Sequence, residues 1–448
     1  MDHWKASPER LIEALRSNGL WRGALLTDLE TGELRASHPV LESIAQAVRD
    51  DDRDYRKHEG CFFEIGRESG HLMTAHLHWT WRGQGAGGIR FWRYATVEDL
   101  VRDGLRLSRG MGQKNALAGL WWGGGKGVVA RRPDIDYGDP AARQGVYRDF
   151  GRFVSGLCGC YVTAEDVGTT PEDMAWIHST TRHTTCIPKE LGGSGNPSVL
   201  TAAGVVVAIE AALDFLGRGS LAGKTVAMQG LGNVSGFMIE ELLRRGVEHI
   251  QAVDIDARAV AAIAARHSSP RLSARQVGPG DLSLFAASCD VLVPNAVGAV
   301  LDPQTIPLIE ASVICGGANN QLADAARDAA ALQGRGILYV PDFIANRMGI
   351  VNCANEQYGY FADDPAIRAH LGRDDPNGIF RRCQEVFRRS RASGRTTAAE
   401  AEALADELGH QPHPIWGHRG RRIIAHLVES GWDRGEPIDY SPLFVNRC

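Results

Sequence analysis

Apolar and polar positions change their period along the chain, and these changes divide it into three regions. Between about residues 60 and 165, short apolar runs such as "LMTAHLHW" are interleaved with helical patterns. In the helical stretch "VEDLVRDGLRLSRGM", four positions share one face: Leu100, Gly104, Leu107 and Met111. Interleaved strands and helices predict an α/β first domain, which we place at residues 1–197.

A second region begins with "NPSVLTAAGVVVAIEAALDFLG", which predicts a helix starting after Asn196 or Ser198 and ending near Gly217. An apolar strand, a glycine turn, an amphipathic helix and a second strand follow in "TVAMQGLGNVSGFMIEELLRRGVEHIQAVDID". Three more strand-like runs, "CDVLVPNA", "ASVICGG" and "GILYVPD", are spaced as parallel strands with crossover connections require. We predict a second domain at 198–345 and a helical segment at 346–448 that packs on the first domain.

Composition places the chain among globular proteins. Its 448 residues suggest two or three domains, and 44% hydrophobic and 23% charged residues are near the average for soluble proteins. A net charge of −5 without a long basic stretch argues against a nucleic-acid partner. Nine cysteines without a C-x-x-C pair indicate reduced thiols. Neither a signal-peptide core nor a run of about 18 apolar residues is evident, so we expect a cytoplasmic protein without a membrane partner.

The glycine turn of the second domain predicts a nucleotide site. Gly230, Gly232, Asn233 and Val234 match G-x-G-x-x-G in its first two glycines, with Ser235 at the third. Because a strand precedes the turn and a helix follows, backbone N–H groups can face a pyrophosphate in a Rossmann-type domain. Asp254, at the end of the next strand, can accept hydrogen bonds from a ribose and repel a 2′-phosphate, which favours NAD over NADP. A glycine turn that serves only helix packing is the alternative.

Two lysines lie twelve residues apart in "GMGQKNALAGLWWGGGKG", an apolar and glycine-rich segment. Glycine lets backbone approach a ligand closely, and burial of Lys126 beside a second cation, Lys114, would lower its pKa toward that of a base. A glycine turn with Lys126 pointing to solvent fits the residues equally well. For Asp166 taken alone, a helix N-cap before "TTPEDMAWI" is the simpler interpretation.

The chain resembles the Glu/Leu/Phe/Val amino acid dehydrogenases, most closely the leucine and phenylalanine branch. The resemblance covers roughly residues 75–360 and rests on ten motifs in family order: "GGIRFWRY", "GMGQKNALAGL", "GGGKG", "YVTAEDVGTT", "PSVLTAAGV", "GLGNV", "PNAVGAV", "GGANNQLA", "PDFIANRMGIVN" and "EQYGY". It implies NAD(P)-dependent, reversible oxidative deamination of an L-amino acid to a 2-oxo acid and ammonia, by a homo-oligomer.

The resemblance also implies roles for individual residues. Lys114 would bind the substrate α-carboxylate, Lys126 would act as general base, and Asp166 would shuttle a proton to and from the amino nitrogen. Gly87 and Gly88 would line the substrate floor, and Thr201 and Asn319 would lie against the nicotinamide. Asn319 and Asn320 as simple helix caps are the alternative for that pair.

The expected side-chain pocket is apolar. Ala86 stands where the glutamate-specific branch has a lysine, and the resemblance adds Ala164, Ile350 and Cys353 to the wall. A second carboxylate buried there without a partner would cost several kcal/mol, so a bulky aliphatic or aromatic amino acid is expected. Each of these residues could instead be plain core packing.

Two departures from the family pattern motivate other hypotheses. Arg347-Met348 replaces small residues at the hinge, and about 40 N-terminal residues precede the usual start. A nucleotide-binding scaffold that has lost catalysis, or a reductase of a biosynthetic imine, would also fit such a chain. His76 and His78 alternate on a strand without a third ligand, so we expect no metal site.

Overall fold

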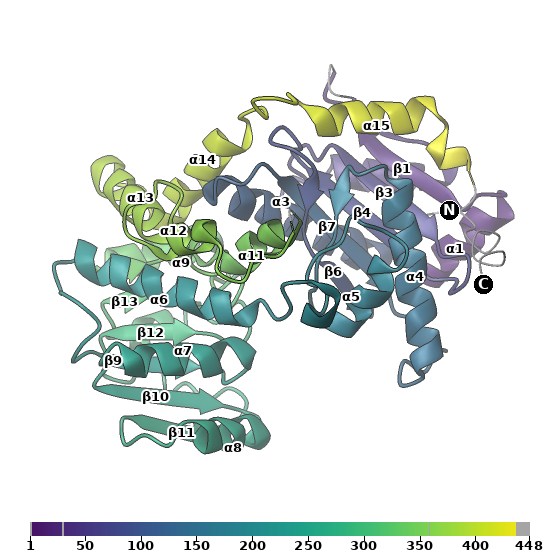
Figure 1. Cartoon of the computed structure of the whole chain (residues 1–448). Helices are drawn as coiled ribbons and strands as arrows, with labels where there is room; N and C mark the ends of the chain where they lie inside the picture. Colours follow the sequence, from purple (N-terminus) through teal and green to yellow (C-terminus); the bar gives the residue numbers. More distant parts are fainter. Residues whose placement is uncertain (1, 29–30, 358, 436–448) are drawn as a thin grey trace.

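The structure is a computed structural model that describes residues 2–28, 31–357 and 359–435. Its two β-sheets form separate lobes joined by helices (Figure 1). The sheet of the first lobe is mixed, and that of the second is parallel throughout. Interleaved strands and helices in both lobes confirm the predicted α/β class.

The first sheet has the strand order β2-β1-β3-β4-β7-β5-β8, with β6 also paired to β7. The glycine-rich run after Trp122 is not a turn: it is β7, a strand buried along its whole length between β4 and β5. The N-terminal residues that the family pattern left unplaced supply the edge of this sheet. Its strands are β1 (Arg22–Thr27), β2 (Leu34–Ala36), β3 (Gly60–Ile65), β4 (Leu72–His78), β5 (Gly85–Ala86), β6 (Ile89–Trp92), β7 (Gly123–Ala130) and β8 (Tyr161–Val162).

The second sheet has the order β11-β10-β9-β12-β13-β14, the arrangement of a dinucleotide-binding domain in which the order reverses beside the first strand. The βαβ unit and the three later strands are where the sequence predicts them, and β11 is an addition. The strands are β9 (Thr225–Gln229), β10 (His249–Asp254), β11 (Leu272–Gln276), β12 (Val291–Pro294), β13 (Val313–Ile314) and β14 (Leu338–Tyr339).

Helices cover both sheets. One face of the first sheet packs on α1 (Pro8–Ser17), α2 (Glu42–Arg49) and α3 (Val97–Leu117), and the other on α4 (Pro140–Gly156) and α5 (Pro171–His178). Helix α3 continues through Gly110 and Gly112, because packing against β7 outweighs the low helix propensity of glycine. The second sheet carries α6 (Ser198–Phe215), α7 (Asn233–Arg244), α8 (Ala257–Arg266), α9 (Ala325–Gly334) and α10 (Asp342–Ala345).

The C-terminal helices divide between the lobes, which corrects the prediction that residues 346–448 pack on the first domain. Helix α13 packs mainly on α6 of the second lobe, α14 bridges α3 and α13, and α15 covers the first sheet (Figure 1). Helix α11 enters both cores, with Met348 and Val351 in one and Ile350 and Cys353 in the other. The helices are α11 (Met348–Gln357), α12 (Pro365–Leu371), α13 (Ile379–Ser393), α14 (Thr397–Gly409) and α15 (Arg419–Glu429).

Helix α6 is long and strongly apolar. It is the one helix in the described part of the chain that is long and apolar enough to cross a membrane by length and composition, although Glu210 and Asp214 interrupt its apolar sequence. Helices α7, α11 and α13 pack against it, and its Val205, Val206 and Ile209 are completely buried. A core helix of a globular protein has the same composition.

A matched pair of glycines on α3 tests this packing. A Cβ at Gly104 would lie 2.2 Å from the buried ring of His76, whereas a Cβ at Gly110 would meet nothing within 4 Å. We therefore expect Gly104→Ala to lower the free energy of unfolding by about 1–3 kcal/mol through overpacking. Gly110→Ala should raise it by up to about 1 kcal/mol through helix propensity. Melting temperatures that move in the same direction would contradict the packing described for α3.

Candidate active site

The site is built on β7, whose backbone lies in close contact with the backbones of neighbouring elements. A Cβ at Gly124 would lie 2.3 Å from the Ser108 carbonyl oxygen on α3, and one at Gly125 would lie 2.7 Å from the Gly85 carbonyl carbon on β5. A Cβ at Gly87 would lie 1.9 Å from the Gly125 oxygen, and one at Gly88 would lie 2.6 Å from the Glu165 carbonyl oxygen in the loop of Asp166. The glycines thus allow close packing of β5, β7, α3 and this loop.

Lys126 is the one residue with a long side chain in this strand of glycines. It is 3% exposed, which excludes the interpretation that it points to solvent. Its Nζ donates to Oδ2 of Asp166 at 2.7 Å, and the Arg90 Nε donates to the same oxygen at 3.2 Å. Asp166 lies in the loop after β8, whereas Thr170 caps α5 in a capping box with Asp173, so Asp166 is not the helix cap.

Electrostatics couple these three groups. Burial lowers the pKa of Lys126, Asp166 opposes that change, and Arg90 is the cation that adds most to the lowering. Lys114, the cation predicted from the sequence, also interacts electrostatically with Lys126. Burial opposes ionisation of Asp166, but Lys126 and Arg90 together lower its pKa below the usual range. The pair thus holds a carboxylate beside an ammonium that loses its proton more easily than a surface lysine.

Lys114 lies on α3 and reaches the second lobe. Its Nζ donates to Oδ1 of Asn319 at 2.9 Å, and the same oxygen accepts from the Asn346 side chain at 2.9 Å. Burial and the charge of Lys126 lower the pKa of Lys114, against the effect of Asp342. Asn319 and Asn320 are not helix caps, because α9 begins at Ala325 with Asp324 as its cap. The contact places Lys114 where the two lobes meet.

The expected pocket residues share one buried apolar cluster. Ala86, Ala164, Ile350 and Cys353 all belong to it, from β5, the loop after β8, and α11. The Sγ of Cys353 lies 3.1 Å from that of Cys186, and both thiols are buried. Below this contact, Glu356 accepts backbone N–H groups of Cys186, Ile187 and Ser194, so a buried carboxylate borders the cluster.

The nucleotide motif adopts the expected turn. Gly230 has φ +94° and a Cβ there would lie 2.7 Å from Ala296, so this glycine is required by packing. Gly232 is the N-cap of α7 and has nothing within 4 Å of an added Cβ, which leaves its backbone open at the helix N-terminus that Asn233 and Val234 begin. Oδ2 of Asp254 accepts from the Leu231 N–H at 2.7 Å, so the carboxylate at the end of β10 faces this turn.

Thr201, the cofactor candidate of α6, has a side chain bonded to its own helix. It lies in the first turn of α6, where its hydroxyl donates to the Pro197 carbonyl at 3.0 Å. A Cβ at Gly349 would lie 3.1 Å from that hydroxyl, so Thr201 abuts the start of α11.

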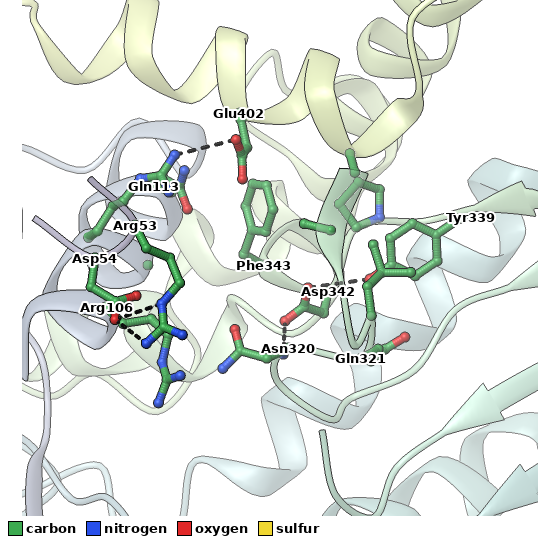
Figure 2. A pocket seen from close by; sticks show the side chains of 16 residues that line it. Arg53, Asp54, Arg106, Gln113, Asn320, Gln321, Tyr339, Asp342, Phe343 and Glu402 are labelled. Carbon is green, nitrogen blue, oxygen red and sulfur yellow. Dashed lines mark hydrogen bonds and ion pairs between the residues drawn. The ribbon is translucent and has the colours of Figure 1, made fainter. Parts of the chain in front are cut away.

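A separate cavity of about 160 Å³ lies beside the contact between the lobes (Figure 2). Arg106 and Gln113 reach it from α3, Asp342 and Phe343 from the second lobe, and Glu402 from α14. Neither Lys126 nor Asp166 lines this cavity, so it is distinct from the ion-pair site.

Comparison with known proteins gives this geometry its context. Residues 192–406 match the family described as Glutamate/Leucine/Phenylalanine/Valine dehydrogenase, and residues 63–183 match its dimerisation domain. The leucine dehydrogenase of Geobacillus stearothermophilus is 37% identical over 351 residues, which cover 78% of this chain and 90% of that protein. The chain belongs to this family.

Other members of the amino acid dehydrogenase family agree. The valine dehydrogenase of Streptomyces coelicolor is 36% identical over 81% of this chain and 94% of its own. The solved structure of L-tryptophan dehydrogenase from Nostoc punctiforme matches with a TM-score of 0.65 and 30% identity, over 81% of this chain and 98% of that one. This chain is thus an amino acid dehydrogenase with a nicotinamide cofactor, and the scaffold hypothesis is set aside.

Sequence reasoning missed three charged residues of this site. Arg90 and Asp103 flank the Lys126–Asp166 pair, and Glu356 borders the apolar cluster. Arg90 could have been predicted as a site residue, because it is the last residue of the "GGIR" motif. Nothing in the local pattern identifies Asp166 as its partner.

Histidines buried behind the site give the protein a predictable acid sensitivity. Burial lowers the pKa of His58 and of His76 to about 3, and that of His78 well below its ordinary value. The unfolded chain, with histidine pKa values near 6.5, binds more protons than the folded one between about pH 6.5 and 3. The contribution of these neutral histidines to the free energy of unfolding should therefore be complete above about pH 6.5 and decrease as the pH falls from about 6.5 to 3.

Urea titrations at pH 7 and pH 5 measure this loss. The loss should shrink in His76→Gln and stay unchanged in His426→Gln, which alters an exposed histidine. An equal loss in both variants would show that the buried rings do not cause the acid sensitivity.

Proposed function

We propose that this dehydrogenase oxidises an apolar L-amino acid, with a bulky aliphatic or aromatic side chain, to its 2-oxo acid and ammonia, reversibly and with NAD. The observation that carries this proposal is the Lys126–Asp166 pair, together with an apolar cluster whose member Ala164 lies two residues before Asp166. The carboxylate of Glu356 beside that cluster would repel the second carboxylate of glutamate. The relatives named above are leucine, valine and tryptophan dehydrogenases, which agrees with an apolar substrate.

In the proposed mechanism, Lys114 holds the substrate α-carboxylate at the meeting of the two lobes. Asp166 takes a proton from the substrate ammonium, and the nicotinamide, when bound, would supply the acceptor for the hydride of the α-carbon. Lys126, with its lowered pKa, then removes a proton from the water that attacks the iminium carbon. Asp166 returns its proton to the nitrogen of the resulting carbinolamine. The C–N bond then breaks with its electron pair leaving on ammonia, the hydroxyl proton passes to the regenerated Asp166 carboxylate, and the 2-oxo acid remains.

The turn at Gly230 and Gly232 fits a dinucleotide. The open backbone at Gly232 and the N-terminus of α7 would hold the pyrophosphate, and the Asp254 carboxylate would accept hydrogen bonds from the ribose. Arg258, a cation shortly after Asp254 in the sequence that could offset this preference, is exposed and paired with Asp256. In this proposal Thr201 and Asn319 border the nicotinamide, and Gly87, Gly88, Ala86, Ala164, Ile350 and Cys353 border the substrate.

We also propose a homo-oligomer that acts in the cytoplasm. One matched region is described as a dimerisation domain, which supports self-association. The eight cysteines within the described residues are all free thiols, as a reducing compartment favours. Light scattering of the purified protein measures the assembly.

A substrate panel tests the main proposal. Leucine, valine, methionine, phenylalanine and tryptophan should reduce NAD, and glutamate should not. The matching 2-oxo acids with ammonia should oxidise NADH. Turnover of 2-oxo acids only with other amines would favour an imine reductase instead.

Removal of the proposed base gives a second test. Lys126→Ala should lower kcat by about 100- to 10,000-fold, the usual contribution of a positioned base, and leave the Kd for NAD nearly unchanged. Lys189→Ala, at an exposed lysine, is the matched control. Rates near wild type in the Lys126 variant would exclude the assigned role.

The coenzyme preference is tested at Asp254. Asp254→Asn keeps an oxygen for the Leu231 N–H but removes the charge, so the ratio of kcat/KM for NADP over NAD should rise several-fold. Glu248→Gln removes an exposed carboxylate that precedes β10 at the end opposite to Asp254, and it should leave the ratio unchanged. A ratio that responds equally to both changes would argue against Asp254 as the discriminating residue.

A further inference from the structure

Arg90 connects the catalytic pair to a second buried carboxylate. From β6 its Nε donates to Oδ2 of Asp166 at 3.2 Å, and its Nη1 donates to both oxygens of Asp103 at 3.1 Å. Asp103, on α3, is also held by the Tyr94 hydroxyl at 2.7 Å and by Arg106 at 3.1 Å. The guanidinium is therefore anchored on one side and presented to the site on the other.

The contacts of Asp166 are not shared equally between its oxygens. Lys126 and Arg90 both donate to Oδ2, and neither donates to Oδ1. A carboxylate that accepts hydrogen bonds from two cations at one oxygen has a fixed plane, because rotation of the carboxylate group would break both charge-assisted hydrogen bonds. Its other oxygen is then held in a defined orientation and accepts no hydrogen bond from Lys126 or Arg90.

We propose that Arg90 is a positioning residue for the dehydrogenase reaction, holding Oδ2 of Asp166 so that Oδ1 exchanges the proton of the substrate nitrogen, while Asp103 keeps Arg90 in place. The proposal rests on the function proposed above and adds to it a residue that contacts neither substrate nor cofactor. Arginine suits this place better than lysine, since its planar fork spans two carboxylates at once.

The two partners Arg90 and Asp103 have opposite effects on the protonation of Lys126. Arg90 lowers the pKa of Lys126 and Asp103 raises it. Other charged or titratable groups near the pair come from every neighbouring element: Lys114 from α3, His76 from β4, Tyr161 from β8, Glu165 from the loop of Asp166, and Tyr94 beside Asp103. Burial raises the pKa of Glu165 to about 7, so any titration assigned to Lys126 must be separated from that of Glu165.

Two charge-removing variants should shift the pH profile of amino acid oxidation in opposite directions. Arg90→Gln removes a cation, so the ammonium of Lys126 is more stable and the rise of kcat/KM with pH should move to higher pH. Asp103→Asn removes an anion, so the same rise should move to lower pH. In both variants kcat should fall by about 10- to 100-fold, part of what a positioned acid or base contributes, with the Kd for NAD unchanged.

Matched variants separate charge from structure. Arg90→Lys should return the profile toward wild type but not kcat, because one ammonium cannot span both carboxylates. Arg102→Gln, which removes an arginine of α3 paired with Asp51 and Glu98, should change neither. Arg90 lines a hollow of about 680 Å³ that opens to solvent, so methylguanidinium should restore part of the rate of Arg90→Ala. Loss of rate without a profile shift, and without rescue, would overturn the proposal.

A direct titration of Lys126 tests its coupling to Arg90 and Asp103 without relying on enzyme turnover. The chain has only six lysines, so Lys126 can be assigned in ¹³Cε-lysine NMR spectra by its absence from Lys126→Ala. In the absence of substrate its titration should move up in Arg90→Gln and down in Asp103→Asn. If these shifts occur but no amino acid is oxidised, the proposed function fails and the electrostatic coupling stands. If amino acids are oxidised and the titration does not move, the role of Arg90 fails alone.

Discussion

The active site depends on a contact between backbones. Strand β7 is in close contact with α3 at Gly124 and with β5 at Gly125, and the ring of Phe150 lies against Gly127. Only residues without a side chain allow this spacing, so the stem of Lys126 is enclosed by main chain, and water is excluded from it. An ammonium in such a place is stable only with a partner, which Asp166 supplies. The sheet therefore creates both the burial that makes the lysine a base and the need for the carboxylate beside it.

Much of the fold could be predicted because its signals are local. The second sheet follows from apolar runs, a glycine turn and an amphipathic helix, all of which lie within short windows. Strand β7 could not be predicted in this way, since glycine has a low β propensity and its partners β4 and β5 are distant in sequence. The placement of α13 against α6 is equally non-local, because an amphipathic face does not specify which surface it covers.

The candidate site divides along the same line. Lys126 and Asp166 stand in motifs that can be recognised in the sequence, and the structure brings them within hydrogen-bonding distance. The contacts of Lys114 with Asn319 and of Arg90 with Asp166 join residues 205 and 76 positions apart, and no periodicity encodes such pairs. The sequence therefore indicates Lys114 as a cation near Lys126, and the folded chain adds Arg90, which lies farther away in sequence.

The departure at the hinge has a mechanical consequence. Arg347 is completely buried, and its guanidinium donates to the carbonyls of Leu117 at the end of α3 and of Asn377 before α13. To separate these segments would strip a buried cation of its acceptors, at a cost of several kcal/mol. Arg347 therefore ties the end of α3 in the first lobe to the segment before α13 on the second lobe. Small residues at positions 347 and 348 would leave these two segments without a shared buried cation.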